Sequence, residues 1–285
     1  MLADTDVGSL VTAAQSGARW GYSLLALQVL LIPVLYVVQE LTARLGTSTG
    51  KGHGELILER YGPVWAWISF AGLLVAGLGA VATEFSGIAA IGDLFHVSRW
   101  FSLALPAVLL FALVATGTYR RVEVVSIAVG LFELVFLWLA WRAHPQAGEV
   151  LRDLAHPPLG QSEYRVLIAA NIGAVIMPWM IFYQQSATAD KGLRREARAS
   201  TRWDTLVGAV VSQLVMGALL IAAAATLHKP GAQQPGLKTV GDLAHAFTPA
   251  LGPVAGQVVL GVGIIAAALV SLNVVSLALA WGFGD

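Results

Sequence analysis

Acidic side chains within apolar stretches are the first feature of this sequence that could do chemistry. These side chains are Asp6, Glu40, Glu84 and Glu133. A charge inside a bilayer is costly unless it is paired, so each ionisable residue in a span is a candidate functional residue. Asp6 stands out because Gly8 and Ser9 interrupt the helix pattern directly after it and could leave backbone carbonyls free.

Structural roles are the alternative for the same residues. Asp6 could simply cap a short helix at 9–18, since aspartate is a favoured N-cap. Glu84 could hold a hydrogen bond between two helices, and Glu40 and Glu133 could belong to structural pairs. The sequence leaves these alternatives open.

A second interruption lies in the segment NIGAVIMPWMIFYQQSA, residues 171–187. Pro178 removes a backbone donor in mid-helix and Gly173 weakens the same turn, so this helix is predicted to break. Broken helices expose carbonyl groups at mid-membrane, and one break in each half of a chain is typical of inverted-repeat transporters. Met177 would add a thioether, which favours Mn²⁺ or Fe²⁺ over Ca²⁺ or Mg²⁺, although a methionine in an apolar helix usually serves packing.

Apolar helices are the elements that must position these residues. Of the 285 residues, 57% are hydrophobic and 12% are charged, whereas an ordinary soluble domain carries about 25% charged residues. The apolar runs are roughly 18 to 28 residues long, which is enough to cross a bilayer. We therefore predict an all-α, polytopic membrane helix bundle with helices at 9–18, 21–45, 63–92, 100–117, 123–142, 164–187, 204–227 and 251–282. The helix at 63–92 is rich in glycine and alanine, which predicts a place in the bundle core.

The charged residues indicate which classes of partner to expect and how the chain is oriented in the membrane. Seventeen basic residues balance seventeen acidic ones, which argues against nucleic acid as a partner and leaves the lipid bilayer. The absence of cysteine excludes disulfides and thiolate metal sites. Ten basic residues fall in the loops after the second, fourth and sixth helices, and seven fall on the opposite side. Because positive loops stay in the cytoplasm, loop 188–203 is predicted to be cytoplasmic in a multi-pass cell-membrane protein.

Several motifs resemble the Nramp family of divalent-metal transporters. DTDVGSLVTAAQSGARWGYSLLALQ and QELTARLGTSTGKGHGELI are similar to the family's first two helices, where Asp-Pro-Gly-Asn precedes Q-x-G-A-x-x-G-Y-x-L-L and then R-L-G-x-x-T-G-K. NIGAVIMP is similar to the Ala-x-x-Met-Pro of the family's sixth helix. The resemblance covers essentially the whole chain and implies a LeuT-like inverted-repeat fold.

The same resemblance implies how the chain is divided. A first repeat with helices 1b–5 is expected at 1–142, an extracellular loop at 143–163, and part of a second repeat with helices 6–8 at 164–285. The fold is expected to be incomplete, because such transporters also have a half-helix before Asp6 and further helices beyond the eighth.

An ion site follows from the resemblance as well. Asp6 matches the family's metal-binding aspartate, Ala174 the residue whose backbone carbonyl binds metal, and Met177 the metal-binding thioether. Ser9 stands where the family has asparagine and offers a shorter hydroxyl ligand. Around these ligands we expect a group that includes the counterpart of the family's Thr-Asp pair near the proton route: Thr83, Glu84, Gly8 and Trp179.

Other positions depart from the family's pattern. Val7 replaces the motif's proline, Trp179 replaces a histidine, and Gly87 replaces an acidic residue. Gln184 or Gln185 replaces a second histidine. The loss of groups that titrate near neutral pH implies weak or absent proton coupling. The shorter hydroxyl ligand implies a roomier site, which suits the reluctantly dehydrated Mg²⁺ and is similar to the family's magnesium-transporting branch.

We therefore expect a transporter of Mg²⁺ and Mn²⁺ that carries no cofactor and lacks strong proton coupling. The alternatives are a proton-coupled Mn²⁺ or Fe²⁺ transporter and an organic-solute transporter of the same fold, although Asp6 disfavours an anionic substrate. The chain is not expected to be an enzyme, because its six histidines fall in loops or at helix ends and offer no base to a hydrolase inside the spans. An inactive fragment, or a subunit that only packs against a partner, is also left open.

Overall fold

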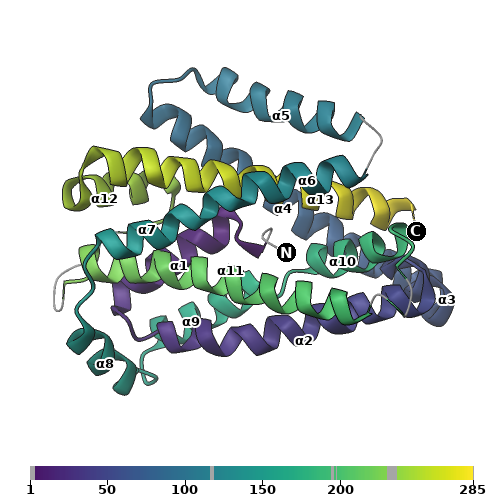
Figure 1. The fold of residues 1–285 in the computed structure, drawn as a ribbon, viewed down its shortest axis with the longest axis horizontal. Coiled ribbons are helices and arrows are strands. Elements are labelled where there is room, and N and C mark those ends of the chain that lie inside the picture. The colour runs from purple at the N-terminus through teal and green to yellow at the C-terminus, as the bar shows by residue number, and fades with distance from the viewer. Residues whose placement is uncertain (1–3, 116–118, 194–195, 197, 230–235, 285) are drawn as a thin grey trace.

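The computed structural model describes residues 4–115, 119–193, 196, 198–229 and 236–284, and the regular elements in these ranges are all helical (Figure 1). The elements are α1 (Val7–Trp20), α2 (Leu25–Thr49), α3 (His53–Tyr61), α4 (Pro63–Leu94), α5 (Arg99–Ala115), α6 (Tyr119–Gly130), η2 (Leu131–Leu134), α7 (Val135–Arg142), α8 (Ala147–Ala155), α9 (Ser162–Val175), α10 (Pro178–Asp190), α11 (Arg198–Leu227), α12 (Val240–Pro253), η4 (Val254–Val259) and α13 (Leu260–Gly284). Within the described ranges, six helical stretches are long and apolar enough to cross a membrane. The predicted all-α membrane bundle is confirmed.

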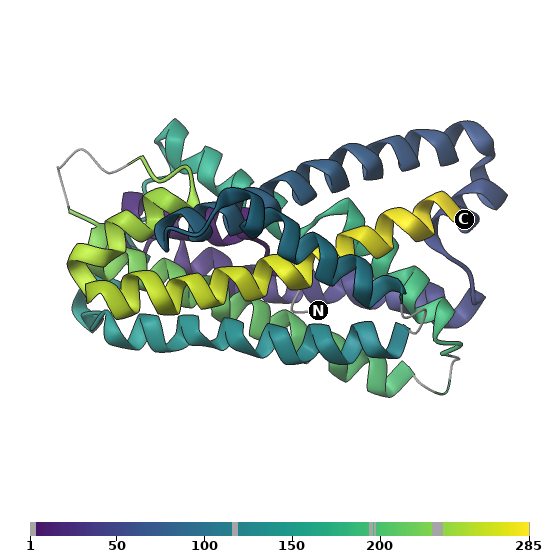
Figure 2. The same cartoon turned by 90° about the horizontal axis from the view of Figure 1, so that it is seen from above.

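The long helices α2, α11 and α13 run along the long axis of the molecule, and α4 is inclined to them (Figures 1 and 2). α1 packs along α11, where a Cβ atom on Gly17 would lie 2.1 Å from the Leu220 carbonyl oxygen, so only glycine permits this approach. α10 packs against both α2 and α13. These contacts build one apolar cluster around α1, α11 and α13 and another around α2, α10 and α13. Figure 1 places the N-terminal end of α1 near the middle of the bundle.

Several helix ends differ from the prediction. α1 begins at Val7 rather than 9, because Asp6 caps it. Gly21, at φ 59°, separates α1 from α2, so α2 begins at Leu25 rather than 21. The short helices α3 and α8 were not predicted, because nine residues each are too few to form a span.

The predicted helix at 251–282 is wrong as a single element. α12 already begins at Val240, where Thr239 and Asp242 form a capping box. Gly252, at φ 85°, then turns the chain before the π-helical η4 and the long α13. The run of apolar residues hid this turn, although Gly252 and Pro253 both disfavour a continuous helix.

α4 is not the core helix that its composition predicted. Of its most apolar 18-residue window, 11% is buried. Gly72 and Gly79 have no atom within 4 Å of the place where a side chain would begin, so these small residues form an open face. The buried residues lie mainly toward the C-terminal end of α4, where Glu84 and Gly87 meet the start of α1.

Candidate ion-binding site

The first predicted ligand lies at the N-terminal end of α1. Asp6 is extended (φ −83°, ψ 169°) and serves as the N-cap, with Oδ1 accepting a hydrogen bond from the Ser9 amide at 2.6 Å. The capping role considered for Asp6 is therefore present. It is compatible with ion binding, because a carboxylate has two oxygens with several acceptor sites and the cap uses Oδ1.

The predicted break in the second half of the chain is confirmed. α9 ends at Val175, Ile176 and Met177 have non-helical backbones (ψ 87° and 137°), and α10 begins with Pro178. In a continuous helix the amide of residue 178 would donate to the carbonyl of Ala174. Proline has no amide hydrogen, so the Ala174 carbonyl lacks this donor.

Ser9 joins the break between α9 and α10 to the predicted interruption at Asp6, where α1 starts; these two places are called the second and the first break. Its hydroxyl donates a hydrogen bond to the Ala174 carbonyl oxygen at 3.0 Å. Three of the four predicted ligands, Asp6, Ser9 and Ala174, therefore lie together. The hydroxyl oxygen can still accept while it donates, and the carbonyl oxygen has a second lone pair. A cation here would meet carboxylate, hydroxyl and carbonyl oxygens, which are ligands that hard divalent ions prefer.

Met177, the fourth predicted ligand, is not in direct contact with Asp6 in the described contacts. It is the half-buried N-cap of α10, and its side chain packs beside the apolar cluster around α2, α10 and α13. It shares a small crevice with Gln39 of α2, and Gln39 donates to Asp4 at 2.8 Å. Among the contacts of the described residues, none joins Met177 to Asp6.

Glu84 and Thr83 reach the start of α1 to different degrees. Glu84 is fully buried and accepts a hydrogen bond from the Val7 amide, with its two oxygens 3.3 and 3.4 Å from the nitrogen. Thr83 is exposed, and its hydroxyl donates to the Gly79 carbonyl at 2.9 Å. Its methyl group lies 3.7 Å from the place of a Cβ atom on Gly8. Glu84 therefore contacts the site, whereas Thr83 borders it.

The remaining predicted positions serve mainly structure. Trp179 is 1% exposed and packs in the apolar cluster around α2, α10 and α13. Gln185 is buried and ties α10 to α3, because its Oε1 lies 2.7 Å from His53 Nδ1. Gln184 lines a separate cavity. Glu40 pairs with Arg44 at 2.7 Å, the structural role considered for it.

Several buried polar residues near the site were not predicted as part of it. Glu133 lies in η2 and is fully buried; Oε2 accepts from the Thr5 hydroxyl, while Oε1 accepts no hydrogen bond from any residue that the structure describes. Asn171 of α9 donates to Ser16 at 2.8 Å and accepts from Gln28 at 2.7 Å. A polar residue inside an apolar run signals both, but their partners are 128 to 155 residues away and cannot be read from the sequence.

The titratable residues do not form a metal cluster by themselves. In the part of the chain that the structure describes, no three His, Asp or Glu side chains are grouped so as to hold a metal ion. An ion at the meeting of the two breaks would therefore depend on uncharged oxygens beside the Asp6 carboxylate. The hydroxyl of Ser9 and the carbonyl of Ala174 meet this need.

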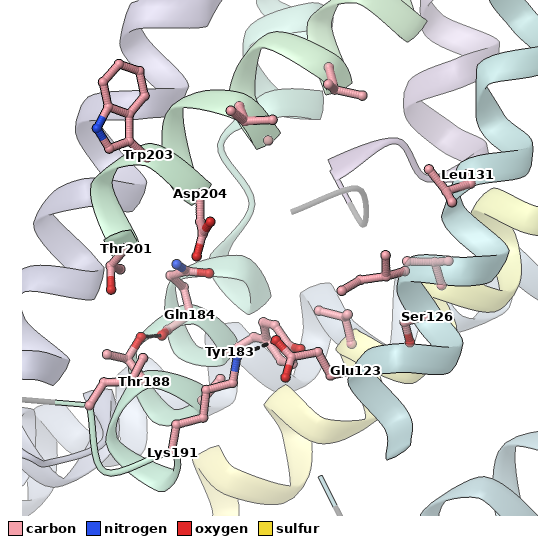
Figure 3. Close-up of a pocket in the computed structure, with 18 of the residues that line it drawn as sticks. Glu123, Ser126, Leu131, Tyr183, Gln184, Thr188, Lys191, Thr201, Trp203 and Asp204 are labelled. Atoms are coloured by element: carbon pink, nitrogen blue, oxygen red, sulfur yellow. Dashed lines mark hydrogen bonds and ion pairs between the residues drawn. The ribbon is translucent and has the colours of Figure 1, made fainter. Parts of the chain in front are cut away.

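A cavity of about 580 Å³ lies between α6, η2, α10, α11 and α13. Figure 3 shows Lys191, directly after α10, paired with Glu123 of α6 at this cavity, and Asp204 of α11 pointing toward Gln184. Leu131, from the same short η2 segment as Glu133, lines the cavity as well. The cavity is large enough to hold a hydrated cation and is separate from the oxygens at the two helix breaks.

Comparison with known proteins shows the family of the chain. The sequence matches the family described as natural resistance-associated macrophage protein-like (Nramp) over residues 1–285. The chain belongs to the Nramp family. Nramp proteins are membrane transporters without a cofactor, so the predictions of a non-enzyme and of a substrate ion are confirmed for the family.

Individual relatives show how much of an Nramp protein is covered. The "Divalent metal cation transporter MntH" of Erwinia tasmaniensis is 30% identical over 286 residues, which cover 96% of this chain and 67% of that protein. That of Ralstonia nicotianae is 29% identical, with 92% and 62% covered. The crystal structure of the Eremococcus coleocola manganese transporter, bound to an aromatic bis-isothiourea-substituted compound, matches with a TM-score of 0.80 at 19% identity and covers 99% and 63% of the two chains. The LeuT-like fold is confirmed, and the chain spans about two thirds of these relatives.

Proposed function

We propose that this Nramp chain carries the site at which a divalent cation crosses a cell membrane. The ligands are the Asp6 carboxylate, the Ala174 carbonyl, the Ser9 hydroxyl and the Met177 thioether. The observation that carries the proposal is the 3.0 Å hydrogen bond from Ser9 to Ala174, because it brings two distant helix breaks together beside a buried carboxylate.

At this site the bound cation compensates the negative charge of Asp6. Asp6 is 7% exposed, so its negative charge is shielded from water and attracts a cation strongly. Backbone and hydroxyl oxygens replace part of the ion's water shell. The two breaks lie at the start of α1 and between α9 and α10, and the site opens to either side as the bundle rocks against its scaffold. Movement is downhill, and the membrane potential supplies about 2.3 kcal/mol per charge per 100 mV.

The ions proposed are Mg²⁺ and Mn²⁺, without strong proton coupling. Oxygen ligands support Mg²⁺, which keeps several of its waters and would need a wide site. The relatives named above are described as a divalent metal cation transporter and a manganese transporter. Met177 next to the break favours the second candidate, a proton-coupled transporter of Mn²⁺ or Fe²⁺, because thioethers bind softer ions.

The orientation is proposed from charge and from the cavity. Lys191, Leu193, Thr201 and Trp203 line the cavity and belong to the region of loop 188–203. With this loop in the cytoplasm, the cavity is the aqueous space on the cytoplasmic side of the site. The first repeat at 1–142 supplies Asp6 and Ser9, the second repeat from 164 onward supplies Ala174 and Met177, and residues 143–163 lie outside the cell.

Uptake into proteoliposomes tests the proposal. Indicator dyes follow Mg²⁺, Mn²⁺ and protons at two pH values for the wild type and for Asp6→Ala. We expect saturable uptake of both ions without proton flux in the wild type, and none in Asp6→Ala. The matched control is Asp242→Ala, which removes a helix-capping carboxylate from α12 and should leave uptake unchanged. Equal uptake by Asp6→Ala and the wild type would overturn the proposed site, and Mn²⁺ uptake with proton flux would favour the second candidate.

A further inference from the structure

Two carboxylates meet the same helix end at the start of α1. The first amides of a helix have no intrahelical acceptor and carry the positive end of the helix dipole. Asp6 accepts from the Ser9 amide at 2.6 Å, and Glu84 of α4 accepts from the Val7 amide at 3.3 and 3.4 Å. Asp6 is the N-cap of α1, whereas Glu84 reaches this end from another helix. The Glu84 contact therefore fixes the helix end to α4.

The side chain of Val7 packs against α4 one turn beyond Glu84. A Cβ atom on Gly87 would lie 2.7 and 2.8 Å from the two Cγ atoms of Val7, closer than real atoms approach. Val7 is 3% exposed, so its side chain fills this space. Gly79, on the same helix, has no atom within 4 Å of its Cβ position. Gly87 is therefore the α4 glycine that meets the start of α1, whereas Gly79 faces open space.

Val7 and Gly87 are two of the positions at which this chain departs from its family's pattern, and they touch each other. Proline at position 7 would have no amide to donate to Glu84. Any side chain at position 87 would collide with Val7 as it stands. The two departures thus form one structural unit with Glu84, which we name the α1 anchor: Val7, Glu84 and Gly87.

We propose that Glu84 is a positioning residue of the ion site, which acts through the α1 anchor to hold Asp6 and Ser9 in place rather than by binding the ion. The inference rests on the proposed function. Val7 lies between Asp6 and Ser9 in sequence, so movement of its backbone moves both ligands. The Ser9 hydroxyl must also stay within reach of the Ala174 carbonyl, at 3.0 Å. An unanchored α1 would bind the ion more weakly, whereas the later steps of transport would be less affected.

Variants of Val7 separate its amide from its side chain. Val7→Pro removes the donor, and proline is well accommodated at the first position of a helix, so α1 still forms. Val7→Ala keeps the donor and removes both Cγ atoms. Glu84→Gln keeps an acceptor oxygen, whereas Glu84→Ala removes it.

Uptake kinetics measured on the whole protein show how each variant changes KM and kcat for the ion. We expect Val7→Pro and Glu84→Ala each to raise KM for Mn²⁺ on the order of tenfold with a smaller change in kcat, as loss of a hydrogen bond to a charged group would. The double variant should be no worse than the more affected single variant, and Glu84→Gln should stay close to the wild type. If Glu84→Gln loses uptake as completely as Glu84→Ala while Val7→Pro is unaffected, Glu84 binds the ion directly and the proposal is wrong.

Packing at Gly87 gives an independent check. Gly87→Ala should raise KM, and the Val7→Ala/Gly87→Ala pair should recover part of the loss because the smaller residue makes room. Gly79→Ala is the matched control and should behave as the wild type. A wild-type KM in Gly87→Ala would contradict the proposal.

Thermal unfolding keeps the anchor testable apart from transport. Val7→Pro and Glu84→Ala should lower the Tm by less in combination than the sum of the single changes, because both remove the same hydrogen bond. If the decreases in Tm add up in the double variant, the hydrogen bond between Val7 and Glu84 is not what the two changes share, and the α1 anchor is wrong. Absence of saturable uptake by the wild type would instead overturn the proposed function, and the unfolding cycle would still decide the anchor.

Discussion

The break before α1 is held by side chains, whereas the break between α9 and α10 is made by the backbone. At the first break, Asp6 and Glu84 each accept a hydrogen bond from an amide of the first turn. At the second, Pro178 withholds an amide and leaves the Ala174 carbonyl without its helical donor. One break therefore contributes charge and the other contributes uncharged dipoles.

This difference assigns separate tasks to the two breaks. Charge at a buried position attracts any cation, so under the proposed function we expect the first break to control how strongly an ion binds. The number and softness of the uncharged ligands decide which ion is preferred, so we expect the second break to control selectivity. Ser9 belongs to the first break and its hydroxyl donates to Ala174 at the second, so we expect the two to act as one site.

Among changes to the uncharged ligands, a substitution that restores a continuous helix at the second break should have the largest effect. In Pro178→Ala the new amide can donate to the Ala174 carbonyl and continue the helix, which removes a ligand; we expect uptake to fall by about tenfold or more. Hydrogen exchange should slow across residues 174–180. Pro33→Ala, which supplies an amide within α2 away from the site, is the matched control. Slowed exchange with normal uptake would show that the carbonyl is not needed.

Replacement of the thioether should change selectivity rather than overall binding. Met177→Leu keeps the volume and removes the sulfur, so KM for Mn²⁺ should rise roughly fivefold while KM for Mg²⁺ stays near the wild-type value. Met180→Leu, three residues along and buried in the apolar cluster, is the control. Equal changes for both ions would place Met177 among the packing residues.

Removal of the hydroxyl that links the breaks should weaken the binding of both ions alike. Ser9→Ala loses one neutral hydrogen bond, worth about 1 kcal/mol, so affinity for either ion should fall roughly fivefold. Isothermal titration with both ions measures this loss. Ser23→Ala removes a similar hydroxyl-to-carbonyl bond, of 2.9 Å, away from the site and should leave affinity unchanged. An unchanged affinity in Ser9→Ala would mean that the breaks act independently.

Local signals made the breaks predictable from sequence. Pro178 removes an amide wherever it stands in a helix, and an aspartate before Gly8 and Ser9 marks a helix start in any fold. The long apolar runs predicted the membrane bundle, because they too can be seen locally in the sequence. Gly252 and the nine-residue helices carried signals too weak to stand out within or between long apolar runs.

Contacts between distant residues could not be predicted. Val7 and Gly87 were recognised as departures from a family pattern, but only the structure shows that they touch. Glu133 was visible as an acid in a span, whereas its partner Thr5 is 128 residues away. The glycine-rich α4 suggested a core helix, yet open space at Gly79 depends on which elements lie beside it.

Isothermal titration of Mn²⁺ and Mg²⁺ into the wild type, Asp6→Asn and Asp6→Ala tests the central claim most directly. Asparagine also caps helices, so Asp6→Asn retains the hydrogen bond from the Ser9 amide and loses only the charge. The account predicts that Asp6→Asn keeps the wild-type Tm but binds neither ion measurably, as Asp6→Ala does. Binding by Asp6→Asn at wild-type affinity would contradict it, because the Asp6 side chain would then serve the helix and not the ion.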